Sequence, residues 1–204
     1  FIGAASIKSS AVFAEESGFS MQNGAYVKVS GEEKGIRFVT DITEEKYASL
    51  AEGYGEENLE FGTLFLPTSL VTDETSLTIE NVASETNEKG AAQVVVDSWV
   101  TYAEETTVRS FVSALTGIPE SRYGAYISAR SYVLDKTTGE IIEYTDVSSR
   151  SVAGVALAGY ADENVKDEQA KQTLMDSYLS GLTFAGLTAD KIGYNALKTS
   201  LLAT

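Results

Sequence analysis

The sequence predicts an α+β fold, with an antiparallel sheet or sandwich-like core and several packed helices, two of them C-terminal. Three observations indicate this class: an apolar run at 61–71, two hairpin patterns at 25–42 and 125–145, and helical apolar spacing in the last forty or so residues. The chain has 204 residues, of which 43% are hydrophobic. That composition is enough to bury one substantial core.

The central prediction is a strand whose two faces both pack against a hydrophobic core. Leu59, Phe61 and Phe65 share one face, and the opposite face also turns apolar toward Leu66. Pro67 ends the strand because its nitrogen cannot donate to a ladder. A glycine inside the strand, Gly62, predicts a bulge or another backbone that passes close by.

Before this strand, the pattern predicts a hairpin of strands 25–29 and 35–42. A helix then begins after the N-cap Thr43 and ends at Gly53. After it, we expect a weak strand over 78–82 and a long strand over 93–102. Apolar spacing from Thr106 to Gly117 predicts a helix.

The last third of the chain predicts one more hairpin and three helices. The hairpin pairs 125–134 with 140–145, and a helix follows the N-cap Ser148 or Ser149. Two C-terminal helices are expected over 166–182 and 189–202. These elements suggest an N-terminal arm or first strand (1–23), a β-rich core domain (24–160) and a helical extension (161–204) that packs on the core or on a neighbour.

Composition excludes several classes of function. The net charge of −15 and the pI of about 4.3 disfavour nucleic acid, because the phosphate backbone would be repelled. The chain contains no cysteine and no histidine, which removes disulfides, thiolate nucleophiles, Cys or His metal sites and Ser-His-Asp triads. We therefore expect no metal and no cofactor. No run approaches the roughly 20 apolar residues of a membrane span, so membrane insertion is not expected.

Several short motifs resemble a known domain. They are GAYVKV, GIRFVTDI, FGTLFLPTSLV, LTGIPESRY, ISARSYV and SRSVAGVA, and together they span about 24–158. The succession is similar to a β-rich domain of large secreted and cell-wall-associated proteins of Gram-positive gut bacteria. The resemblance implies a non-catalytic role at an extracellular or cell-surface location, and it implies no catalytic residues.

Arginine is distributed unevenly, with Arg37 the only one outside residues 109–150. Within that segment five basic and five acidic groups cancel, so an anionic partner is repelled least there. On the expected strand, Arg130 shares a face with Tyr126 and Tyr132, and rings beside forked donors suit a glycan. The candidate ligand-binding residues are Arg130, Tyr132, Tyr126, Arg37 and Trp99. The alternative interpretation is structural: the arginines pair with Asp41 or Asp97, and Trp99 belongs to the core.

The favoured function is a non-catalytic adhesion or carbohydrate-binding module with a glycan as partner. The alternative is a self-assembling subunit of a filament, fibre or virion, in which an apolar arm carrying Phe1, Ile2 and Ile7 adds a strand to a neighbouring subunit. A carboxylate glycosidase is a third possibility, with Glu104–Glu105 or Asp162–Glu163 as acids. The loop 135–140 has oxygen ligands but lacks the alternating acids of a calcium loop.

Overall fold

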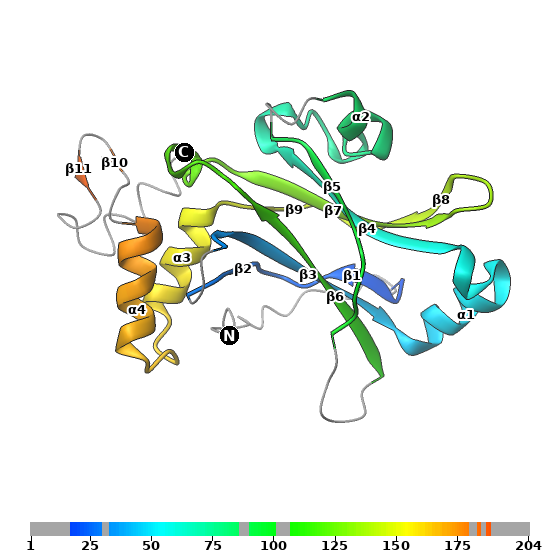
Figure 1. The fold of residues 1–204 in the computed structure, drawn as a ribbon, viewed down its shortest axis with the longest axis horizontal. Helices are drawn as coiled ribbons and strands as arrows, with labels where there is room; N and C mark the ends of the chain where they lie inside the picture. The colour runs from blue at the N-terminus through cyan, green and yellow to red at the C-terminus, as the bar shows by residue number, and fades with distance from the viewer. Residues whose placement is uncertain are drawn as a thin grey trace.

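The computed structural model describes residues 17–29, 33–85, 90–100 and 107–179, together with the short pairs 183–184 and 187–188. The arm residues Phe1, Ile2 and Ile7 and the expected helix over 189–202 lie outside the described residues. Two antiparallel sheets form the centre of the molecule, and helices lie around them (Figure 1). The predicted α+β class is confirmed.

The first sheet is organised around the nine-residue strand β3 (Gly35–Thr43). One edge of β3 pairs along its whole length with β6 (Val108–Thr116). Its other edge is shared by β1 (Phe19–Met21) and β2 (Tyr26–Val27). The expected hairpin of β2 and β3 is therefore present, and β6 forms the far edge of this sheet.

The second sheet is organised around β4 (Leu59–Pro67), which is the strand predicted from the central apolar run. It lies between β5 (Ala92–Val95) and β7 (Ile127–Asp135). The far edge of β7 carries β8 (Glu140–Tyr144) and β9 (Ser148–Arg150), which confirms the second hairpin. A separate small hairpin joins β10 (Thr183–Phe184) to β11 (Leu187–Thr188).

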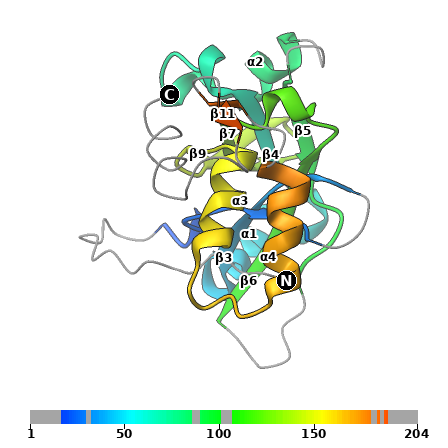
Figure 2. The same ribbon diagram turned by 90° about the vertical axis from the view of Figure 1, so that its left-hand side faces the viewer.

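Helices cover the ends and one outer face of the sheets. The first, α1 (Glu44–Tyr54), begins at the predicted cap, where the Thr43 side chain accepts from the Lys46 amide. The helices α3 (Val152–Ala161) and α4 (Glu168–Leu174) lie side by side at the opposite end (Figure 2), and a π-helical turn, Met175–Leu179, continues α4. The short α2 (Ile79–Ser84) lies over the second sheet. Among the described residues, no helix has the length and apolar character of a membrane span.

Four local predictions were wrong. The residues expected to form a helix after Thr106 form β6, because their apolar spacing also fits a strand and a nine-residue ladder with β3 is available. The weak strand over 78–82 is α2, capped by Thr78. Of the long strand expected over 93–102, the structure forms only the short β5, which ends at Val95, and residues 101–102 lie outside the described residues. The helix expected after Ser148 or Ser149 begins later, because those residues pair with β7 in β9 and Ser151 provides the cap.

A layer of buried hydroxyl groups joins the two sheets. Thr63 Oγ1 of β4 donates to Ser113 Oγ of β6 at 2.8 Å. A hydroxyl has one proton, so Ser131 must donate to Thr63 (2.8 Å) and Thr40 to Ser131 (2.7 Å). All four residues are at most 1% exposed. The layer separates an apolar cluster around Phe38 and Phe65, which α3 and α4 complete, from another around Phe61 and Phe111.

The glycine in β4 has a packing role. A Cβ atom on Gly62 would collide with the ring and hydroxyl of Tyr132, which is directly opposite on β7. The prediction of a close approach is therefore right, but the approaching group is a side chain and not a backbone. Because Gly62 has no side chain, it leaves room for the fully buried Tyr132 ring.

Candidate functional site

Arg130 and Tyr132 lie on one face of β7, as expected, but α2 and the segment before it cover much of this face. Tyr132 is fully buried and belongs to an apolar cluster with residues of α2 and the segment before it. Its phenol donates to Glu60 Oε1 at 2.9 Å and accepts from Gln93 Nε2 at 2.7 Å. Burial raises the pKa of Tyr132 far above its ordinary value, so the phenol remains a donor. Tyr132 is therefore a core residue and not a ligand contact.

Arg130 and Arg37 hold parts of the chain together. Arg130 Nε donates to the Thr145 carbonyl at 2.9 Å, and its guanidinium lies 4.3 Å from the centre of the Tyr144 ring. Arg37 is 9% exposed, and its guanidinium donates to the Glu33 carbonyl at 3.3 Å. The partners that the structure describes for these two arginines are mainly backbone carbonyls, where the sequence predicted Asp41 or Asp97.

Trp99 closes one end of the space between the sheets. Its ring makes edge contacts with Phe61, Phe111 and Tyr47, with centroids 5.2, 5.5 and 5.6 Å apart. The guanidinium carbon of Arg109 lies 3.8 Å from the centre of the Tyr47 ring. The same guanidinium donates to both carboxylate oxygens of Glu44, and this bidentate pair raises the pKa of Arg109. Trp99 is partly buried, and these contacts pack it against the apolar cluster around Phe61 and Phe111.

Part of the outer edge of β6 has no backbone partner among the residues that the structure describes. Val100 N donates to the Ser110 carbonyl, so the backbone N–H and C=O groups of Ser110 point away from β3. In an antiparallel ladder this orientation alternates, and Val112, Ala114 and Thr116 therefore point their N–H and C=O groups outward as well. The described residues give these three no backbone partner. An unpaired edge of this kind can accept another strand.

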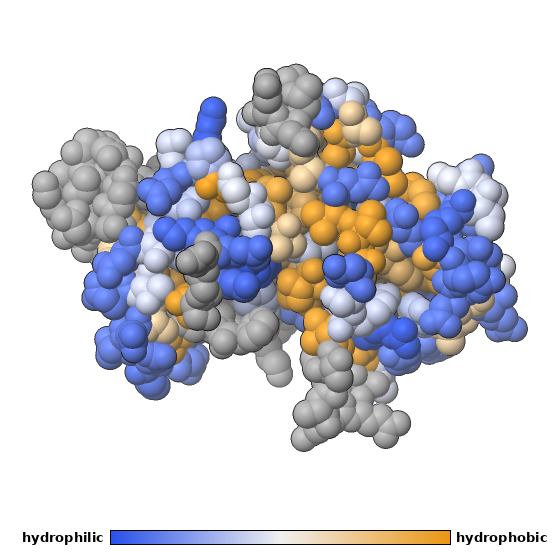
Figure 3. All heavy atoms as spheres, viewed as in Figure 1, coloured by the Kyte–Doolittle hydropathy of each residue, from blue (hydrophilic) through white to orange (hydrophobic). Residues whose placement is uncertain are grey.

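The outer edge of β5, which pairs with no other described strand, lies on the same side of the molecule. Val96 N donates to the Phe61 carbonyl, so Val95 faces outward from β5. The segment 96–100 then crosses from the second sheet to the first, where it reaches Ser110 of β6. Val95 is 49% and Val112 41% exposed, and Figure 3 shows hydrophobic surface over this side of the two sheets. Exposed apolar side chains beside open strand edges mark an interaction surface.

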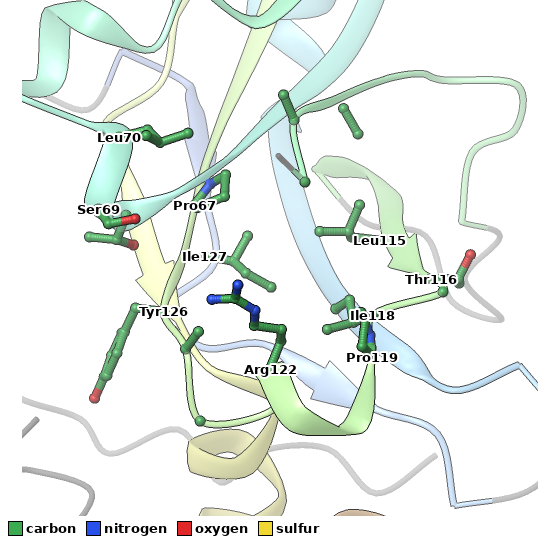
Figure 4. A pocket seen from close by; sticks show the side chains of 17 residues that line it. Pro67, Ser69, Leu70, Leu115, Thr116, Ile118, Pro119, Arg122, Tyr126 and Ile127 are labelled. Carbon is green, nitrogen blue, oxygen red and sulfur yellow. The ribbon is translucent and has the colours of Figure 1, made fainter. Parts of the chain in front are cut away.

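A groove opens where β6 ends. It has a volume of about 1230 Å³ and is lined mainly by the ends of β4, β5 and β6 and by the connection from β6 to β7. Most of the lining is apolar, including Leu70, Leu115 and Ile118, and Arg122 is the one charged residue in it. Figure 4 shows the Arg122 side chain reaching into the groove, with its guanidinium directed toward Ile127 and away from Ile118.

Arg122 differs from the other four arginines of the chain. Arg37, Arg109, Arg130 and Arg150 all donate to protein oxygens. The Arg122 guanidinium forms no hydrogen bond or ion pair with any residue that the structure describes. The nearby Glu120 is 3.6 Å from Lys34 Nζ. The groove therefore offers an uncompensated positive charge in a chain of net charge −15.

The remaining candidates are distributed around this centre. Tyr126 is 36% exposed and lies at the rim of the groove, so it is the one predicted ligand residue that is near it. Asp135 accepts hydrogen bonds from Thr137, which lower its pKa, and the described residues hold no acidic cluster suited to a metal ion. Asp162 accepts from Asn164 beyond the end of α3, and Glu104–Glu105 lie outside the described residues.

Comparisons of this chain with protein-family models, curated proteins and solved structures found no match.

Sequence reasoning missed the main features of this site. The outward alternation of β6 was hidden because its residues were interpreted as a helix. Arg122 belongs to the electrically balanced segment 109–150, which the sequence predicts to be the region least repulsive to an anion. No sequence signal distinguished it from Arg130, because the difference lies in which oxygen atoms each arginine can reach.

Proposed function

We propose that this chain is a non-catalytic, self-assembling module that captures an extended segment of a neighbouring copy along the open edge of β6. The captured segment is the N-terminal arm, residues 1–14. We further propose an extracellular or cell-surface setting, which rests on the sequence resemblance alone.

The observation that carries the proposal is the row of outward backbone groups at Val112, Ala114 and Thr116, beside exposed apolar side chains. An added strand would satisfy these groups and cover Val112, as in recognition by strand addition. The arm suits this role because residues 1–14 contain no acid and one lysine, Lys8, in a chain with 30 acidic residues. A segment that carries one positive charge and no acid is not repelled by an acidic neighbour.

Two variants test strand capture. Removing residues 1–14 takes away the donor, and Ala114→Pro takes away an outward N–H without breaking the ladder to β3. We expect the wild-type chain to form oligomers whose mass rises with concentration in sedimentation or light scattering. Each variant is expected to weaken this association at least tenfold.

The matched control is Ala114→Thr, which keeps the N–H group and suits a strand. Thermal unfolding of every variant separates lost assembly from lost folding. A wild-type chain that stays monomeric at all concentrations contradicts the proposal. So does association that persists unchanged after residues 1–14 are removed.

Glycan binding is a second candidate, favoured by the exposed Tyr126 ring at the rim of a groove that contains Arg122. The expected ligand is a sugar with a carboxylate, because a ring face and a forked cation are both present. On an array of neutral and acidic oligosaccharides, we expect binding only to acidic ones and a loss of at least fivefold with Tyr126→Ala. Equal binding by Tyr126→Ala and wild type would exclude this site.

A further inference from the structure

We infer that Arg122 recognises the acidic pair Glu15–Glu16, which directly follows the donated arm (residues 1–14) of a second copy, and that the arm therefore runs parallel to β6. This inference rests on the proposed strand capture and specifies its direction and its charged contact.

The groove is apolar and carries one positive charge. Its lining is neutral except for Arg122, whose guanidinium is exposed and has no partner among the described residues. A guanidinium presents several donors in a fork that matches a carboxylate. A segment that fills this groove is therefore expected to bring apolar side chains and one carboxylate.

The sequence changes from acid-free to acidic directly after the arm. The acid-free stretch 1–14 is followed directly by Glu15–Glu16. The groove lies at the Thr116 end of β6, so the edge and the groove follow one another along the strand. Only an arm parallel to β6 places its neutral stretch along the edge and its two acids at the groove.

Glu15 and Glu16 of the same copy are too far along the chain from the groove to contact Arg122. Ser17 follows Glu16, and the Gly18 carbonyl accepts from Thr43 N, which lies opposite Val108 at the far end of β6. Thr116 is eight residues further along β6, which corresponds to about 26 Å. Two residues of extended chain span about 7 Å, so Glu15 and Glu16 cannot reach the groove of their own molecule. The contact must form between two copies.

Charge reversal tests the contact in the full chain. We expect Arg122→Glu to weaken association about tenfold, and Glu15→Lys with Glu16→Lys to weaken it similarly. Combining all three changes should restore association to within about threefold of wild type. The control is Lys136→Glu, which makes the same change in net charge in the exposed turn between β7 and β8 and is expected to have little effect.

Cysteine pairs test the direction, because the natural chain has no cysteine. Mixing an Ala14→Cys chain with a Thr116→Cys chain should give a disulfide-linked dimer, whereas Phe1→Cys with Thr116→Cys should not. The reverse result shows an antiparallel arm and overturns the inference.

Failure of this inference differs from failure of strand capture. If Ala114→Pro and arm removal abolish association but the three reversals do not restore it, strand capture stands and the Arg122 contact is wrong. If Arg122→Glu weakens association and the reversed acids do not, Arg122 binds another anion and the inference is again overturned.

Discussion

Replacing Gly62 with alanine is expected to cost about 3 kcal/mol of folding stability, the largest single effect that we predict for such a small change. The added methyl group would occupy the space of the Tyr132 hydroxyl and ring edge. Tyr132 cannot move aside, because its ring is fully buried and its hydroxyl is bonded to Glu60 and Gln93. Urea unfolding monitored by circular dichroism measures the loss.

The matched control is Gly53→Ala, in the exposed last turns of α1, where a Cβ meets nothing within 4 Å. This change is expected to be neutral or to stabilise by up to about 1 kcal/mol, because alanine favours a helix. A double-mutant cycle with Tyr132→Ala tests whether the collision with Tyr132 causes the loss of stability. In that background Gly62→Ala should cost much less, and an undiminished cost would show that the collision with Tyr132 is not its cause.

Thr63→Val is expected to destabilise the protein by about 1–3 kcal/mol, although the two side chains have nearly the same shape. Valine cannot donate to Ser113 or accept from Ser131, and both serines are buried between the sheets. A buried hydroxyl without a partner loses its hydration and gains nothing in exchange. Unfolding in urea again gives the size of the effect.

Two comparisons isolate the hydroxyl layer as the cause. Thr116→Val, at an exposed position of β6, should change stability by less than about 0.5 kcal/mol. Replacing the whole layer with Thr40→Val, Thr63→Val, Ser113→Ala and Ser131→Ala should recover part of the loss, because no unpaired hydroxyl remains. If the quadruple variant loses as much folding free energy as the four single variants together, the hydroxyl groups do not form a connected network.

Hydrophobic alternation and turn residues predicted much of the sheet framework correctly. Pro67 ends β4, Thr43 caps α1, and the hairpins of β2 with β3 and β7 with β8 lie close to their expected positions. These features depend on local chemistry: a missing amide proton, a short side-chain acceptor, or a tight turn between two apolar strands. Such constraints act over a few residues and can be seen without the rest of the fold.

The errors arose where two local patterns fit equally well. In β6, the apolar residues Val108, Phe111, Val112 and Leu115 match a helical stripe, but the nine-residue ladder with β3 decides for a strand. The partner strand is more than sixty residues away in sequence, so no local window contains it. Propensity is a weak determinant when long-range pairing is available.

The sequence by itself determined the α+β class, the acidic charge, the absence of cysteine and histidine chemistry, and the region least repulsive to an anion. Only the tertiary structure decided which side chains of that region can contact a ligand. Arg130 and Arg122 are eight residues apart and chemically identical, but Arg130 lies beside the Thr145 carbonyl and Arg122 faces an apolar groove. The physical reason is that hydrogen bonding saturates: an arginine whose donors are satisfied within the fold has less to offer a ligand, and which donors are satisfied depends on groups that the folded chain brings together.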